Sequence, residues 1–245
     1  MHPALQSVAH RPWPLPAGPW VMTQTWHDLL FAHWPIPVDV MRAVVPAQLE
    51  LDTWQAQCWV GVVPFRMSGI RGHGLPGVPG ATSFPELNVR TYVTHGGKAG
   101  VYFFSLDATS RLAVTAARTF YHLPYFHAMM RTESQAGEIL YNSVRQRGNA
   151  EFVGRYKPIA PVELRQQGTI EHWLSERYCL YTVHRGEVYR GEVHHAPWPL
   201  QDAEAHLERN TMAASAGLQL PNCSPRLHFA QRLDVLIFPL RRVVP

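Results

Sequence analysis

Hydrophobic and polar positions alternate with a period of two over many short stretches of the chain, which is the pattern of half-buried β-strands. Glycine, proline and polar residues separate these stretches, and the segment HGGK (95–98) is typical of a hairpin turn. Residues 21–34 are expected to mix strand and turn. The predicted strands are 49–54, 57–66, 84–93, 100–108, 125–131, 137–145, 151–157, 177–184, 187–194 and 233–238.

Helical periodicity replaces this alternation in only a few places. Over 109–121 it puts Leu112, Ala116 and Phe120 on one stripe, and Pro124 ends the predicted helix. Further helices are predicted at 37–45, near 169–176 and at 200–216, and the Gly/Pro-rich residues 69–83 are expected to form a loop. These elements predict a mainly β protein of the α+β class. It would consist of an irregular N-terminal segment, 1–20, and one domain, 21–245.

Composition narrows the class of protein. The chain has 245 residues, 46% hydrophobic and 16% charged, which suits a folded domain and argues against disorder. It has no apolar run of spanning length and its first residues lack the apolar core of a signal peptide, so we expect no membrane association and a cytoplasmic location. The net charge is +4, but the arginines are scattered apart from the pair Arg241-Arg242, so no nucleic-acid partner is expected.

Several short motifs carry no chemistry in their context. Gly72, Gly74 and Gly77 match the dinucleotide pattern G-x-G-x-x-G, but Pro76 and Pro79 prevent the helix that this pattern must open. The three cysteines are too few and too far apart for a disulfide framework or a zinc site. The fourteen histidines lack acidic or cysteine partners at ligand spacing, so neither a metal nor another cofactor is expected.

The strand predicted at 84–93 is the most informative segment of the chain about function. Alternation puts Glu86, Asn88, Arg90 and Tyr92 on one side of it. Leu87, Val89 and Val93 lie on the other side. Such a polar face has two explanations from spacing alone. It either faces solvent, as one side of many antiparallel strands does, or it lines an interior where Glu86 and Arg90 must find partners.

Six segments, in this order along the chain, resemble the YqjF-like family, a domain of unknown function within the acetoacetate decarboxylase-like superfamily. They are WVGVVPFRM (59–67), FPELNVRTYV (84–93), GVYFFSLDA (100–108), LPYFHAMM (123–130), ERYCLY (176–181) and HHAPWPL (194–200). The resemblance runs from about Trp26 to Pro239. It implies that 21–245 form a single acetoacetate decarboxylase-like domain, a cone-shaped antiparallel β-barrel with a few flanking helices around a ligand cavity.

The resemblance also bears on the reaction. Acetoacetate decarboxylases form a Schiff base through a lysine in a Gly-Phe-Pro-Lys-Lys-like segment after a helix, and the similar segment here, HLPYF (122–126), has Tyr125 at that position. Tyrosine cannot form an imine. Of the two lysines, Lys98 is expected at a solvated turn tip and Lys157 lies on a different strand. Glu86 resembles the cavity glutamate of the superfamily, which favours an inward-facing polar side for strand 84–93.

The first functional hypothesis is an enzyme without a Schiff base that acts on a small organic acid or related carbonyl compound. Glu86 would be its general acid or base, and Tyr125 would stabilise an oxyanion or protonate a carbanion. Arginines would clamp a substrate carboxylate in a bidentate pair. The side chains expected to bind the substrate are Arg66, Asn88, Arg90, Tyr92 and Arg118.

Two alternatives remain open at this stage. The cavity could bind a small-molecule ligand without catalysis, with Tyr125 acting only as a plug whose hydroxyl satisfies Glu86 or Arg118. The protein could instead have a structural role in an assembly, because the decarboxylase relatives are oligomers; a homo-oligomer is therefore among the expectations.

Overall fold

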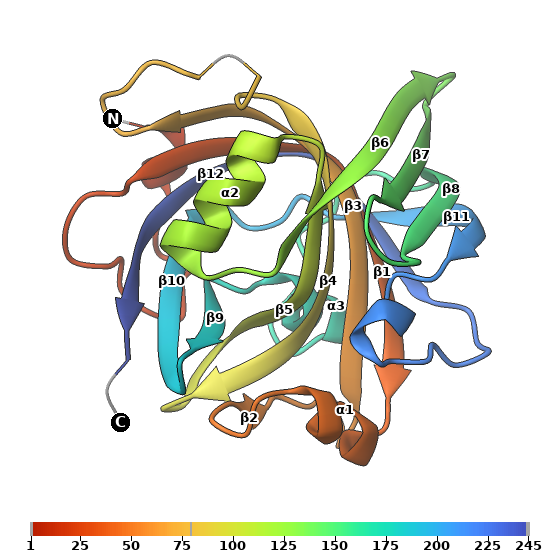
Figure 1. Ribbon diagram of the computed structural model, residues 1–245, viewed down its shortest axis with the longest axis horizontal. Helices are drawn as coiled ribbons and strands as arrows, with labels where there is room; N and C mark the ends of the chain where they lie inside the picture. The colour runs from red at the N-terminus through yellow and green to blue at the C-terminus, as the bar shows by residue number, and fades with distance from the viewer. Residues whose placement is uncertain (1, 79, 244–245) are drawn as a thin grey trace.

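The computed structural model describes residues 2–78 and 80–243, and one 12-stranded sheet dominates them (Figure 1). The helices are α1 (Val38–Val44), α2 (Arg111–Tyr121) and α3 (Ile170–Ser175), with short 3-10 turns η1 (Pro3–Gln6) and η2 (Ala214–Ala216). The strands are β1 (Met22–Ile36), β2 (Glu50–Leu51), β3 (Cys58–Gly72), β4 (Phe84–His95), β5 (Lys98–Ala108), β6 (Tyr125–Gln135), β7 (Glu138–Arg145), β8 (Glu151–Pro158), β9 (Cys179–His184), β10 (Glu187–His195), β11 (Gln201–Asn210) and β12 (Arg226–Arg242).

The sheet is mixed rather than purely antiparallel. Strand β5 runs parallel to β6 and to β9, and the other strand pairs are antiparallel. The connection through α2 explains the first parallel pair, because a helical crossover lets the next strand start beside β5 in the same direction. The mainly β class is therefore confirmed, and the sheet is mostly antiparallel, as expected, with two parallel strand pairs that the sequence did not predict.

Hydrogen bonding links seven strands into a closed circuit. It passes from β1 through β3, β4, β5, β9, β10 and β12 and returns to β1. Strands β6, β7, β8 and β11 form a branch that leaves β5 and rejoins β12, and the far ends of β6 and β7 project away from the rest in Figure 1. Helix α2 lies across one side of the sheet, where the Tyr121 hydroxyl donates to the Phe238 carbonyl of β12 at 3.3 Å.

Strand β4 separates the main hydrophobic core from a second interior. Leu87, Val89 and Val93 are fully buried and pack into a core that also holds Phe152 and Tyr156 of β8. The alternate residues of β4, including Glu86, Asn88 and Arg90, are also buried but face the other way. The predicted two faces of this strand are thus present, and neither of them is a solvent face.

The helix predicted at 200–216 was wrong. Residues Gln201–Asn210 form strand β11, which pairs with β8 in the register Ala205↔Tyr156, and only η2 is helical. Ala203, Ala205 and Leu207 turn inward while the acidic and basic residues between them are exposed, so the burial has a period of two. Helix-favouring residue types misled the prediction, because pairing with β8 outweighs intrinsic propensity.

The helix predicted at 109–121 is confirmed as α2, but its buried side is not the predicted stripe. Leu112 and Phe120 are 63% and 71% exposed, whereas Val114 is buried and Ala117 lines a cavity.

Other element boundaries also differ from the predicted ones. β1 is one continuous strand whose expected turn reduces to a left-handed residue, Asp28, and β3 extends into the expected 69–83 loop. Positions 1, 79 and 244–245 of the expected segments lie outside the described residues. No helix in the described ranges has the length and apolar character needed to cross a membrane.

Candidate functional site

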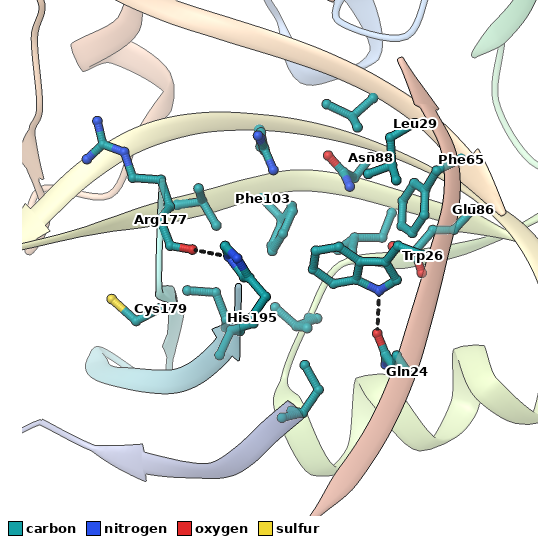
Figure 2. Close-up of a pocket in the computed structure, with 18 of the residues that line it drawn as sticks. Gln24, Trp26, Leu29, Phe65, Glu86, Asn88, Phe103, Arg177, Cys179 and His195 are labelled. Carbon is teal, nitrogen blue, oxygen red and sulfur yellow. Dashed lines mark hydrogen bonds between the residues drawn. The ribbon is translucent and has the colours of Figure 1, made fainter. Parts of the chain in front are cut away.

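A cavity of about 120 Å³ lies within the seven-strand circuit, and α2 forms part of its wall through Ala117 and Tyr121 (Figure 2). Its wall is mainly apolar and aromatic, with polar groups at a few points. The polar and aromatic lining residues are Gln24, Trp26, Phe65, Glu86, Asn88, Arg90, Phe103, Tyr121, Tyr125, Ser175, Arg177, His195 and Trp198. The predicted residues Glu86, Asn88, Arg90 and Tyr125 are therefore brought together at one site.

Glu86 and Tyr125 form a hydrogen-bonded pair in the cavity wall. The Tyr125 hydroxyl donates to Glu86 Oε2 at 2.7 Å, and Glu86 is only 3% exposed. Burial is the main cause that raises the pKa of Glu86 to about 8; the Tyr125 hydrogen bond opposes this shift and the nearby charge of Asp107 adds to it. Burial and the adjacent Glu86 hold the pKa of Tyr125 well above its usual range. Both groups consequently carry their protons at neutral pH.

The surrounding strands fix this pair in position. The Tyr141 hydroxyl of β7 donates to the backbone carbonyls of Glu86 (2.7 Å) and Phe65 (3.1 Å). These contacts link β4 to β3 at the residue that carries the carboxyl group. Arg118 of α2 donates Nε–H to the Tyr125 carbonyl at 2.6 Å, at the first residue of β6. Hydrogen bonds from β7 and α2 therefore fix the backbone of Glu86 and that of Tyr125, which positions the two side chains.

Asn88 and Arg90 supply polar atoms that the protein itself leaves without partners. Arg90 is 8% exposed and its Nε has no hydrogen-bond acceptor among the described residues. Its guanidinium lies over the ring of Phe31 at 5.2 Å and reaches the Leu174 carbonyl at 3.5 Å. The Asn88 Oδ1 atom is buried and unbonded as well. An unpaired buried cation beside a cavity favours an anionic ligand.

Residues of α3, β10 and the segments next to them complete the wall and were not predicted as site residues. His195 Nδ1 lies 2.7 Å from the Ala196 carbonyl and Nε2 lies 3.4 Å from that of Arg177 (Figure 2). Burial lowers the pKa of His195, so the ring is neutral. The guanidinium of Arg177 points away from the cavity and pairs with Asp52. The only sequence signal for this wall was the resemblance of segments 176–181 and 194–200 to the family.

Three predicted binding residues do not line the cavity. Arg66 pairs with Asp28 at 2.5 Å and its side chain is partly exposed at the outside of the sheet. Tyr92 lies on the same side of β4 as Glu86 but is fully buried, with its hydroxyl bonded to His33 and donating to the Leu174 carbonyl. Arg118 contacts the backbone of Tyr125 rather than the cavity. Any effect of these three on a ligand would be indirect.

Neither lysine reaches the cavity. Lys98 donates to Glu192 Oε1 at 2.6 Å with its side chain only 12% exposed, so the expectation of a solvated turn tip was wrong. Lys157 pairs with Glu204 on the surface. Among the described residues, no group of three or more His, Cys, Asp or Glu side chains is placed to hold a metal ion.

Comparison with known proteins gives both close and distant similarities. The model of the DUF2071 family, described as an uncharacterized conserved protein, matches residues 23–234. YqjF of Bacillus subtilis (strain 168), an uncharacterized protein, is 49% identical over 229 residues, which cover 93% of this chain and 95% of that protein.

Solved structures of similar fold are much more distant in sequence. Acetoacetate decarboxylase from Legionella pneumophila has a TM-score of 0.67 at 12% identity, covering 96% of this chain and 93% of that one. The enduracididine biosynthesis enzyme MppR complexed with pyruvate has a TM-score of 0.64 at 9% identity, covering 92% and 91%. At such identities these likenesses show a shared fold and nothing more.

Proposed function

The chain belongs to the DUF2071 family, as a YqjF-like protein, and we propose that it is an enzyme that moves a proton on a small organic acid or carbonyl compound without forming a Schiff base. In this proposal the closed circuit of seven strands corresponds to the barrel that the family resemblance implies, and the substrate binds in its cavity.

The observation that carries the proposal is the buried Glu86–Tyr125 pair. A carboxyl group whose pKa is raised to about 8 has both its acid and its base form within reach near neutral pH, which is what proton transfer at a carbon or oxygen atom requires. The Tyr125 hydroxyl beside it is a neutral donor that is never ionised in this range. No lysine is among the residues that line the cavity, so the proposal does not include an imine.

A proton-transfer step fits these groups without any further reagent. Glu86 is mostly protonated at neutral pH, and its minor ionised form is the base. This carboxylate takes a proton from the carbon next to the substrate carbonyl, and the electron pair of that C–H bond moves into the enolate. The Tyr125 hydroxyl donates a hydrogen bond to the enolate oxygen, where the negative charge develops. Return of the proton from Glu86 to the substrate restores the carboxylate. Arg90 holds the substrate carboxylate throughout this cycle, so that its charge is paired.

The size of the cavity limits the substrate. About 120 Å³ is somewhat smaller than an engineered cavity of about 150 Å³ that holds one benzene molecule. A ligand of only a few non-hydrogen atoms, such as a short keto or hydroxy acid, fits this space. One structural neighbour was solved in complex with pyruvate, which is a molecule of this class.

Binding without catalysis is the second candidate. It is favoured by the mainly apolar wall and by the unbonded Asn88 and Arg90 atoms, which suit ligand retention as well as reaction. In that case the Glu86–Tyr125 hydrogen bond would only satisfy two buried polar groups.

Proton NMR in D2O distinguishes the two candidates. A panel of small keto and hydroxy acids is incubated with the protein, and we expect at least one to lose its C–H signal next to the carbonyl as deuterium replaces hydrogen. Glu86→Gln should abolish this exchange and Tyr125→Phe should slow it strongly, while the exposed control Glu208→Gln keeps it. Ligand signals that broaden on binding but never exchange or convert would contradict the enzyme and favour the binding protein.

A further inference from the structure

A second hollow, here called the basic hollow, lies on the other face of β10 and β12 from the cavity. Val193 and Ile237 line the cavity, whereas their chain neighbours Glu192 and Phe238 line the basic hollow, as expected for strands whose successive side chains point to opposite faces. Its volume is about 400 Å³. The charged residues in the rest of its wall are Lys98, Arg190, Arg241 and Arg242.

The charges of the basic hollow do not balance. Its wall holds four cationic side chains and one carboxylate, Glu192, which leaves an excess of three positive charges. Glu192 is already shared: Lys98 approaches Oε1 at 2.6 Å, Arg190 approaches the same atom at 2.9 Å, and Arg11 approaches Oε2 at 3.7 Å. Two neighbouring charges do not change this excess. Glu187, which pairs with Arg242, adds one negative charge, and Arg11, which approaches Glu192, adds one positive charge.

Two of the arginines face each other directly. Arg190 of β10 and Arg241 of β12 are cross-strand partners in the register of this antiparallel pair. Like charges at such positions repel each other and destabilise the sheet unless an anion lies between them. Arg241 has no carboxylate partner among the described residues; its guanidinium donates to the Ala17 carbonyl at 3.0 Å, and this bond holds it at the wall.

We infer that the basic hollow is a binding site for a small organic anion with two or more negative charges, carried on phosphate or carboxylate groups. The arginine forks match the oxygen geometry of either group. A multivalent anion would neutralise the excess charge and relieve the repulsion between Arg190 and Arg241. The volume of the hollow is within the range of ordinary small-molecule sites. This site is separate from the cavity and does not depend on the reaction proposed for it.

Isothermal titration calorimetry with pyrophosphate and with citrate tests the inference at low ionic strength. The variant is Arg241→Gln, because Arg241 is exposed and its removal breaks no ion pair within the described residues. The matched control is Arg147→Gln, another exposed arginine, which lies in the loop between β7 and β8 and outside the wall of the basic hollow. We expect binding to the wild type and the control. In Arg241→Gln it should be weaker by about tenfold, the effect of losing one charge-assisted hydrogen bond.

Each outcome decides a separate point. Binding of pyrophosphate alone identifies a phosphate-bearing ligand, binding of citrate alone a polycarboxylate, and binding of both a requirement for charge only. Higher ionic strength should weaken the binding of either anion. Failure of both anions to bind the wild type, or equal affinity in Arg241→Gln and Arg147→Gln, would overturn the inference.

Discussion

Replacing Glu86 with glutamine removes a buried ionisable group while keeping its shape and its ability to accept the Tyr125 hydrogen bond. In the unfolded chain this carboxyl ionises near pH 4.5, whereas in the folded protein it stays protonated up to about pH 8. Between these values the unfolded state binds fewer protons than the folded state, so rising pH lowers the stability of the wild type. One pKa unit corresponds to about 1.4 kcal/mol, so the cost grows by about 3 kcal/mol between pH 5 and pH 8.

Urea unfolding of the wild type and of Glu86→Gln at several pH values between 5 and 8 measures this cost. We expect the free energy of unfolding of the variant to exceed that of the wild type by a margin that widens by about 3 kcal/mol over this range. The exposed control Glu208→Gln should follow the wild type at every pH. If the curves of Glu86→Gln and the wild type stay parallel, Glu86 ionises at an ordinary pKa and the reasoning about its burial is wrong.

Three further predictions concern substitutions at Tyr125, Arg145 and Gly100. Tyr125→Phe removes the hydroxyl that lowers the pKa of Glu86, so that pKa should rise further, and denaturant unfolding at pH 5 should show a loss of about 1 kcal/mol. Arg145→Met leaves the fully buried Asp107 without its bidentate partner and should cost about 3–5 kcal/mol, and Asp107→Asn in the same chain should recover part of it in calorimetry. Gly100→Ala puts a Cβ atom 2.7–2.8 Å from atoms of β9 and should destabilise by about 1–3 kcal/mol, seen as a lower melting temperature.

The sequence predicted the parts of the site that depend on local periodicity. Glu86, Asn88 and Arg90 share one face of β4 because strand side chains alternate, and this alternation is visible in the sequence. Their inward direction and the place of Tyr125 came from the family resemblance. The 2.7 Å contact between Glu86 and Tyr125 joins residues 39 positions apart, a distance over which periodicity alone carries no information.

Long-range pairing accounts for what the sequence did not predict. Arg66 pairs with Asp28 because β1 and β3 are neighbouring strands, and the sequence of neither segment indicates their register. Segment 201–210 is a strand because its backbone pairs with that of β8, although its residue types favour a helix. The face of α2 that carries Leu112 was expected to be buried, yet the smaller residues of that helix pack against the sheet instead.

Carbon-13 NMR of the protein labelled at its glutamate side-chain carboxyls tests the central claim most directly, because it reports the protonation of Glu86 itself. The resonance that disappears in Glu86→Gln identifies the group. We predict that this resonance keeps the shift of a protonated carboxyl through neutral pH and titrates with a midpoint of about 8. Complete titration of every glutamate below pH 6 would contradict a protonated Glu86 and, with it, the proposed proton transfer.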